Sequence, residues 1–230
     1  DVYKRQGLFM PISVPVEPHR VELSPIPMTE PDTTPESGWP VVGDDGLARP
    51  PWAAHDPLLR EYYDTEWGMP VTDEHGMFER VCLEGFQVGL SWRLILQKRD
   101  ALREAFHGFE PEAVASMSIE HLLDDASLIR NRRKLEAAVK NAQATLSLRD
   151  EGTHLGEFVW SYQPSQTPCP RTMEEVPTRS PESEQLAKDL KKRGFTFVGP
   201  VTMYALMEST GIVDTNLVGT WRRGASGVWA

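Results

Sequence analysis

Residues 188–206 read KDLKKRGFTFVGPVTMYAL, a stretch that predicts two helices joined by a short hairpin. Basic residues close the first helix, and Gly199 and Pro200 mark the start of the second. The first backbone N–H groups of that second helix would point outward and, together with the helix dipole, form a site for a phosphate group. The same sequence also fits a plain helical hairpin in which Gly199 only closes a turn. The turn alone therefore leaves the function open.

The rest of the chain from Trp52 onward also shows helical spacing of its apolar residues. Asp73 can cap a helix that runs to a glycine-marked turn at 85–91, after which Trp92 begins a second helix. Further helices are expected over residues 110–126, 131–150, 154–162, 181–193 and 200–212, and Ser180 can cap the one over 181–193. No alternating strand pattern of useful length appears in the sequence, so we expect an all-α fold.

The N-terminal part of the chain differs in composition from the rest. Residues 1–51 hold more than half of the 19 prolines, and proline at this density removes hydrogen-bond donors and blocks helix formation. We therefore expect a disordered or extended tail over residues 1–48, a helical domain over 49–224 and a short C-terminal tail over 225–230.

The composition excludes several classes of protein. The 230 residues contain no uninterrupted apolar run of about 18 residues, which a membrane-spanning helix needs. The only cysteines, Cys82 and Cys169, are too few for a disulfide framework or a four-cysteine iron–sulfur site. We therefore expect no membrane association and a location in the reducing cytoplasm.

The net charge of −10 argues against a protein that binds DNA by bulk positive charge. Basic residues nevertheless outnumber acidic ones strongly in two segments, 128–143 and 186–193. Such runs are often only the solvated face of a helix. If they serve DNA binding, the positive potential should be confined to one face, formed by Arg130–Lys134 together with Lys192 and Arg193 beside the hairpin.

Glu84 lies inside the apolar helical run that ends at the glycine-marked turn. An ionised carboxylate there costs several kcal/mol unless it is hydrogen-bonded or lines a pocket. Trp52, Tyr62 and Trp92 lie near enough in the sequence to share such a pocket, which would suit a flat heteroaromatic ligand with an exocyclic amine. Alternatively, the aromatic residues belong to the core and Glu84 pairs with an arginine. Spacing alone leaves both interpretations open.

Short motifs then follow one another along the chain from about Arg49 to Arg223. They are Asp56-Pro57-Leu58, Glu66-Trp67-Gly68, Leu83-Glu84-Gly85, Gly89-Leu90-Ser91-Trp92, Phe158-Val159-Trp160-Ser161, Leu190-Lys191-Lys192-Arg193-Gly194-Phe195 and Phe197-Val198-Gly199. As an ordered set they resemble the DNA-3-methyladenine glycosylase I family. The resemblance implies the all-α helix-hairpin-helix DNA glycosylase fold and an enzyme of base-excision repair, which flips out an alkylated purine and hydrolyses its N-glycosidic bond.

The resemblance also implies roles for individual residues. Glu84 matches the glutamate with which the family recognises the base. Tyr62 and Trp92 match residues that stack on the base or bond to it, and Trp52 matches the tryptophan that closes the pocket. Leu90 is a candidate wedge for the space that the flipped nucleotide leaves.

The hairpin around Gly199 would, by the same resemblance, hold the backbone of double-stranded DNA that contains alkylated bases. No lysine follows the hairpin, where Thr202 and Met203 stand, so a Schiff-base lyase step is not expected. The sequence therefore predicts a monofunctional glycosylase, acting as a monomer.

Members of the family usually carry a zinc ion bound by two cysteines and two histidines. The matching positions here are Pro50, Tyr63, Asn216 and Thr220. None of these four is a cysteine or a histidine, so we expect no zinc and no other cofactor. Packing and hydrogen bonds through Tyr63 and Asn216 can still join the two ends of the domain.

Asp214 is a second departure from the family, in which this position is commonly asparagine. A carboxylate at this point can stabilise a transition state that resembles an oxocarbenium ion, or orient the attacking water. An aspartate that merely bonds to the backbone of a C-terminal turn explains the residue as well. The sequence leaves the two roles open.

Two other classes of function remain open at this level. A catalytically silent helix-hairpin-helix DNA-binding module would keep Gly199 and the basic segments but would have no need of a pocket around Glu84. A helical protein-interaction domain would use the basic helices for an acidic partner and would bind no duplex at any salt concentration. A glycosylase for another alkylated or deaminated purine is the nearest alternative among enzymes.

Overall fold

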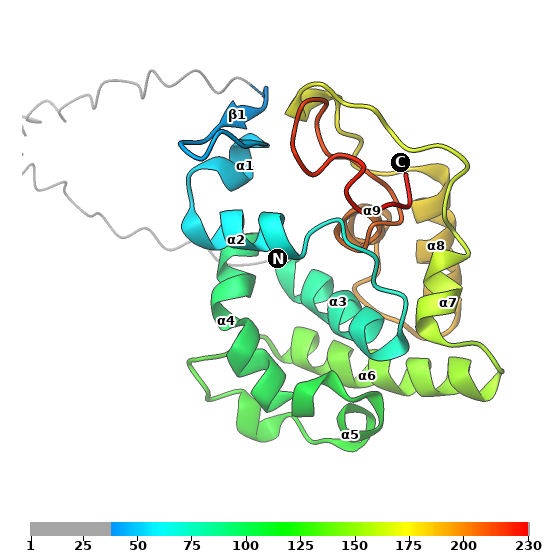
Figure 1. Ribbon diagram of the computed structural model, residues 1–230. Helices are drawn as coiled ribbons and strands as arrows, with labels where there is room; N and C mark the ends of the chain where they lie inside the picture. The colour runs from blue at the N-terminus through cyan, green and yellow to red at the C-terminus, as the bar shows by residue number, and fades with distance from the viewer. Residues whose placement is uncertain (1–37, 230) are drawn as a thin grey trace, which may run out of the picture. The chain divides into compact units, whose positions relative to one another are not determined.

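The computed structural model describes residues 38–229, and helices dominate these residues (Figure 1). In chain order the elements are β1 (Val41–Val42), β2 (Ala48–Arg49), α1 (Pro51–Ala54), α2 (Pro57–Thr65), α3 (Glu74–Gln87), α4 (Trp92–Ala105), η1 (His107–Phe109), α5 (Pro111–Ser116), η2 (Glu120–Leu122), α6 (Arg132–Asp150), α7 (Leu155–Trp160), η3 (Met173–Glu175), α8 (Pro181–Lys192) and α9 (Pro200–Ser209). The helical fold expected from the sequence is confirmed. Within the described residues, no helix has both the length and the apolar content for a membrane span.

Local side-chain chemistry sets where the main helices begin. The Asp73 carboxylate accepts a hydrogen bond from the backbone N–H of Gly76 at the start of α3, and the Ser91 hydroxyl accepts one from Leu94 at the start of α4. Ser180 and Ser183 form a reciprocal capping box at the start of α8. Each cap satisfies backbone N–H groups that have no partner inside the helix. The predicted caps at Asp73 and Ser180 are therefore confirmed.

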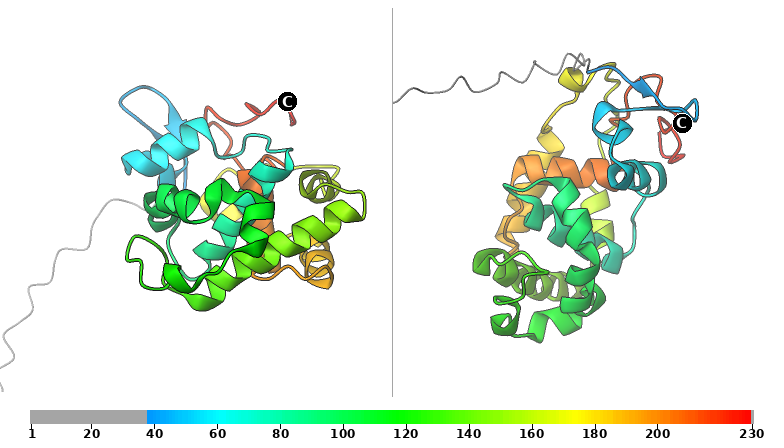
Figure 2. Two further views of the ribbon diagram at one scale, coloured as in Figure 1. Left: turned by 90° about the horizontal axis from the view of Figure 1, so that it is seen from below. Right: turned by 90° about the vertical axis from the view of Figure 1, so that its left-hand side faces the viewer.

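Helix α3 is the central element of the domain. It packs against α4, α6, α7 and α9, and its apolar side chains join those of the other helices in one hydrophobic core. Helix α7 approaches the loop before α3 so closely that a Cβ atom on Gly156 would lie 2.0 Å from the carbonyl oxygen of Thr72. Figures 1 and 2 show the N-terminal strands and the C-terminal segment at one end of the domain and α5 at the other.

The structure differs from the expected elements in two places. The helix expected over residues 110–126 ends at Ser116, where Met117 adopts an extended conformation, and only the short turn η2 follows. Residues 38–48, which the sequence placed in the tail, form the antiparallel pair β1–β2 and connect to the domain, since Trp221 N donates to the carbonyl of Ala48 at 3.1 Å. The rest of the expected tail lies outside the described residues.

Candidate active site

Glu84 is buried in the middle of the domain, with 4% of its surface exposed. Helix α3 carries it, and the hydroxyl of Ser209 on α9 donates a hydrogen bond to Glu84 Oε1 at 3.3 Å. Among the described residues it forms no ion pair, because Arg80, one turn earlier on the same helix, is bonded to Glu66 at 2.9 Å. The geometry therefore lacks the arginine partner that would explain a buried glutamate as part of the core.

The Glu84 carboxyl faces a cavity of about 490 Å³ that also contains the predicted aromatic residues. Trp52 comes from α1, Tyr62 from α2 and Trp92 from the first turn of α4. The rings of Tyr62 and Trp92 lie 5.4 Å apart, centroid to centroid, with their planes inclined by 48°. Four consecutive helices thus place an acid among aromatic side chains, in one cavity.

Two polar atoms in this wall have no hydrogen-bond partner in the protein. The hydroxyl of Tyr62 and the indole N–H of Trp92 are both buried. A buried donor left unpaired costs about 1–3 kcal/mol, so such groups are expected where a ligand satisfies them. The cavity can therefore bind a flat molecule through its faces by stacking and through its edge by hydrogen bonds.

The cavity contains a second acid, Glu208 on α9, which was not predicted from the sequence. Its Oε1 accepts a hydrogen bond from the hydroxyl of Thr215 at 2.6 Å. Burial raises the pKa of Glu84 to about 8, and the neighbouring charge of Glu208 adds to this effect. Burial likewise raises the pKa of Glu208 to about 7. The signal that singled out Glu84, an acid within an apolar helical run, also applies to Glu208.

The hairpin between α8 and α9 has the geometry expected of two helices joined by a tight turn. Gly194 and Phe197 adopt positive φ angles of 91° and 58° and reverse the chain. Asn141 on α6 holds the turn, because its side chain accepts from Thr196 N at 2.7 Å and donates to Thr196 O at 3.2 Å. Gly199 has φ of −75°, so it starts α9 in an extended conformation instead of making the turn.

The two basic residues predicted beside the hairpin differ in their surroundings. Lys192 is exposed, and its nearest acidic partner is Asp189 at 3.3 Å. The guanidinium of Arg193 lies over the ring of Phe158, 4.8 Å from the centroid, so part of its role is packing. Both lie at the end of α8 that leads into the turn.

The basic segment 128–143 divides into surface and buried groups. Arg130 is exposed and has no ion pair among the described residues, and Arg133 and Lys140 line a hollow of about 350 Å³ together with Phe197 of the hairpin. Lys134 instead points inward, where its Nζ donates to the carbonyl oxygens of Phe86 and Val88 at the C-terminal end of α3. It is 8% exposed, and burial lowers its pKa. The expectation that Lys134 contributes to a positive surface is therefore wrong.

Two predicted site residues remain. Leu90 lies beside the cavity, and Asp214 lies outside its wall. Leu90 follows Gly89, whose φ is +75°, and packs partly against the hydrophobic core beside the cavity residues Ser91 and Trp92. Asp214 does not line the cavity. Its carboxylate accepts hydrogen bonds from the N–H and the side-chain amide of Asn216 and from Gly224 N, all at 2.8–2.9 Å. This is the geometry of an aspartate that holds a turn.

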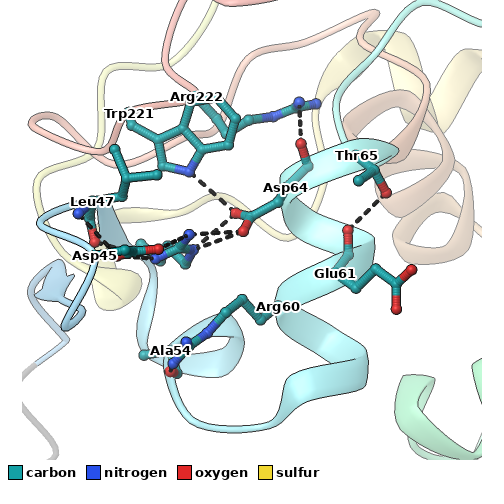
Figure 3. A network of polar contacts seen from close by, with 10 residues as sticks. Asp45, Leu47, Ala54, Arg60, Glu61, Asp64, Thr65, Trp221 and Arg222 are labelled. Atoms are coloured by element: carbon teal, nitrogen blue, oxygen red, sulfur yellow. Dashed lines mark hydrogen bonds and ion pairs between the residues drawn. The ribbon is translucent and has the colours of Figure 1, made fainter.

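Hydrogen bonds join the N-terminal and C-terminal segments beside the cavity. Tyr63 donates to Asn216 Oδ1 at 2.7 Å, as the sequence suggested. Arg49, which is 3% exposed, binds Asp64 through Nε at 2.8 Å and through Nη2 at 2.7 Å, and Trp221 Nε1 donates to the same carboxylate at 3.1 Å (Figure 3). Within residues 38–229, no three His, Cys, Asp or Glu side chains are placed to hold a metal ion.

Comparison with known proteins places this arrangement in a family. A family model described as methyladenine glycosylase matches residues 52–223, which include every residue that we predicted for the site. The chain belongs to the methyladenine glycosylase family. DNA-3-methyladenine glycosylase of Haemophilus influenzae is 44% identical to it over 175 residues, which cover 74% of this chain and 94% of that protein.

Solved structures of methyladenine glycosylases share the fold. A crystal structure of 3-methyladenine DNA glycosylase I superposes with a TM-score of 0.74 at 40% identity, covering 76% of this chain and 99% of the other. The enzyme from Staphylococcus aureus, solved to explain how it recognises 3-methyladenine, gives a TM-score of 0.70 at 36% identity and covers 74% of this chain and 93% of its own. The expected family is therefore confirmed.

Proposed function

We propose that this protein is a DNA glycosylase of base-excision repair, which hydrolyses the N-glycosidic bond of 3-methyladenine in DNA. The observation that carries the proposal is the buried, unpaired Glu84 in an aromatic cavity, within a chain that belongs to the methyladenine glycosylase family. Alkylation at N3 makes the base cationic and a good leaving group, so modest stabilisation of the departing base suffices. Selectivity then depends on the cavity that receives the flipped base.

The base would enter the cavity edge first and meet Glu84 at its inner end. Glu84 would accept a hydrogen bond from the exocyclic amine. Tyr62 and Trp92 would either stack on the base or donate hydrogen bonds to it from their free O–H and N–H groups. Trp52 would close the cavity. We do not assign a catalytic role to Asp214, because three hydrogen bonds already hold its carboxylate in the turn.

Duplex DNA would approach across the α8–α9 hairpin. The first N–H groups of α9, beyond Gly199, would bind a backbone phosphate, and Lys192, Arg193 and Arg130 would contribute positive charge around it. Leu90 would fill the space left by the flipped nucleotide. No lysine stands at the start of α9, so we propose a monofunctional enzyme. We also propose that it works as a monomer in the cytoplasm, with residues 49–224 as its glycosylase domain.

Base release from defined DNA tests the proposed function. We expect the protein to release free 3-methyladenine from duplexes that carry this single lesion and to leave no strand break without added base, since it has no lyase lysine. Duplexes with hypoxanthine in the same position provide the matched comparison. Release of hypoxanthine alone, or binding without release of either base, would overturn the proposal.

We further propose that this member of the family works without zinc. The four positions at which the family usually has its ligands hold Pro50, Tyr63, Asn216 and Thr220, and Tyr63 and Asn216 already bond to each other. None of these side chains offers the thiolate or imidazole that a tetrahedral zinc site needs. Elemental analysis of the purified protein should find well under one equivalent of zinc per chain, and a chelator should leave excision unchanged. One tightly bound equivalent would contradict this.

A further inference from the structure

The carboxyl group of Glu208 lines the same cavity as that of Glu84 but comes from a different helix. Glu208 directly precedes Ser209, the residue that donates a hydrogen bond to Glu84. Thr215 donates to Glu208 Oε1 at 2.6 Å, and Oε2 has no hydrogen-bond partner among the described residues. Two acidic groups therefore share one cavity with the unpartnered hydroxyl of Tyr62, which is 3% exposed.

No cation in the described part of the chain forms an ion pair with either carboxyl group. Arg80, the basic residue nearest to Glu84 along α3, is bonded to Glu66, and its positive charge lowers the pKa of Glu84 by less than burial raises it. Arg93 at the cavity wall is bonded to Asp56. The titratable and polar groups near Glu208 include the acid Glu84 and the hydroxyls of Thr215 and Tyr204, none of which carries positive charge. A buried and a half-buried carboxyl group that share a cavity and have no ion-pair partner cannot both ionise at low cost, so the pair retains a proton.

A cationic ligand would supply the missing charge. Alkylation at N3 gives the base of an adenine nucleotide a positive charge, whereas the unmodified base is neutral. A cation between the two groups would favour the ionised form of both, and the attraction is stronger in a cavity of low dielectric constant than in water. A neutral base of similar shape gains stacking and hydrogen bonds alone. The second carboxylate therefore adds discrimination by charge to discrimination by shape.

We propose that Glu208 is a specificity-determining residue which, together with Glu84, selects a positively charged purine over a neutral one. This inference rests on the proposed function and deepens it, because it assigns the selection of charge to a pair of residues on α3 and α9. In this role Glu208 binds the base and takes no part in breaking the bond. Its effect should therefore appear in the relative affinity for charged and neutral bases.

Tryptophan fluorescence titrations at mildly alkaline pH would test the proposal with two free bases. One is 3,9-dimethyladeninium, a fixed cation, and the other is 3-methyladenine in its neutral form. We expect the intact protein to prefer the cation, and Glu208→Gln to weaken cation binding about tenfold while neutral binding changes less than twofold. Unchanged binding of the neutral base would also show that the variant is folded.

Glu104→Gln is the matched control, since it removes one carboxylate from an exposed position on α4 and should leave both affinities unchanged. An unaltered preference for the cation in Glu208→Gln would overturn the inference. An equal loss for both bases would overturn it as well, since this would mark Glu208 as a purely structural residue. In either of these two outcomes, release of 3-methyladenine from DNA by the intact protein would show that the proposed function stands and that only this inference fails.

Discussion

Replacement of Glu84 by glutamine is expected to slow the release of 3-methyladenine by about a hundredfold or more. Glutamine has nearly the same shape, so the cavity and its stacking surfaces remain. It carries no negative charge, however, and its amide places a donor where the carboxylate offers an acceptor to the base. Single-turnover excision from a duplex with one 3-methyladenine measures the effect. Duplex affinity should stay within about twofold, because Glu84 lies in the cavity, away from the hairpin that is proposed to bind the phosphate backbone.

The stability of the same variant separates loss of chemistry from loss of folding. The pKa of Glu84 is raised to about 8 in the folded protein, so the group stays protonated there at a pH at which it ionises in the unfolded chain. The wild-type protein therefore loses stability as the pH rises from about 5 towards 8, whereas glutamine has no such dependence. The melting temperature of Glu84→Gln should increasingly exceed that of wild type over this range. Excision at the wild-type rate, or a variant less stable than wild type at pH 8, would contradict this account.

The features of the fold and of the site that could be predicted are those that depend on residues close together in the sequence. Asp73 and Ser180 cap their helices because a short polar side chain reaches the free N–H groups of the first turn. Glu84 stands out because a carboxylate in an apolar helical run needs a specific surrounding. These signals depend on residues within one or two turns of each other, so a single sequence contains them.

Other features depend on the packing of distant segments, which no local pattern contains. Lys134 looks like its basic neighbours on α6, yet it turns inward because the carbonyl groups at the C-terminal end of α3 need donors. The strands β1 and β2 have two residues each, too few for an alternating pattern, and Arg49 orders them by binding Asp64 of α2. In such cases a helix face or a loop obtains its partner only when the chain is folded.

Replacement of Asp64 by asparagine is expected to lower the free energy of unfolding by about 3 kcal/mol. The Asp64 carboxylate accepts hydrogen bonds from Nε and Nη2 of the buried Arg49 guanidinium and from the indole of Trp221. Asparagine leaves Arg49 with Asp45 as its only carboxylate partner among the described residues, and the side chain of Asp45 is 43% exposed and thus well solvated. A buried guanidinium that loses its main counter-charge is far more costly than the loss of an exposed ion pair. Urea unfolding followed by tryptophan fluorescence measures the change.

The effect of Asp64→Asn should extend to the active site, because Arg49 directly precedes the segment that contributes Pro50 and Trp52 to the cavity wall. Glu61→Gln is the control: it removes an exposed carboxylate from the same helix and should change the free energy of unfolding by less than about 0.5 kcal/mol. When both proteins are warmed, Asp64→Asn should lose excision activity at a lower temperature than wild type. Added zinc should not restore this activity. If Asp64→Asn and Glu61→Gln are equally stable, the network around Asp64 does not hold the two ends of the domain together. If zinc restores the activity, a metal contributes to that closure, and the hydrogen bonds of Tyr63 and Asp64 are not sufficient for it.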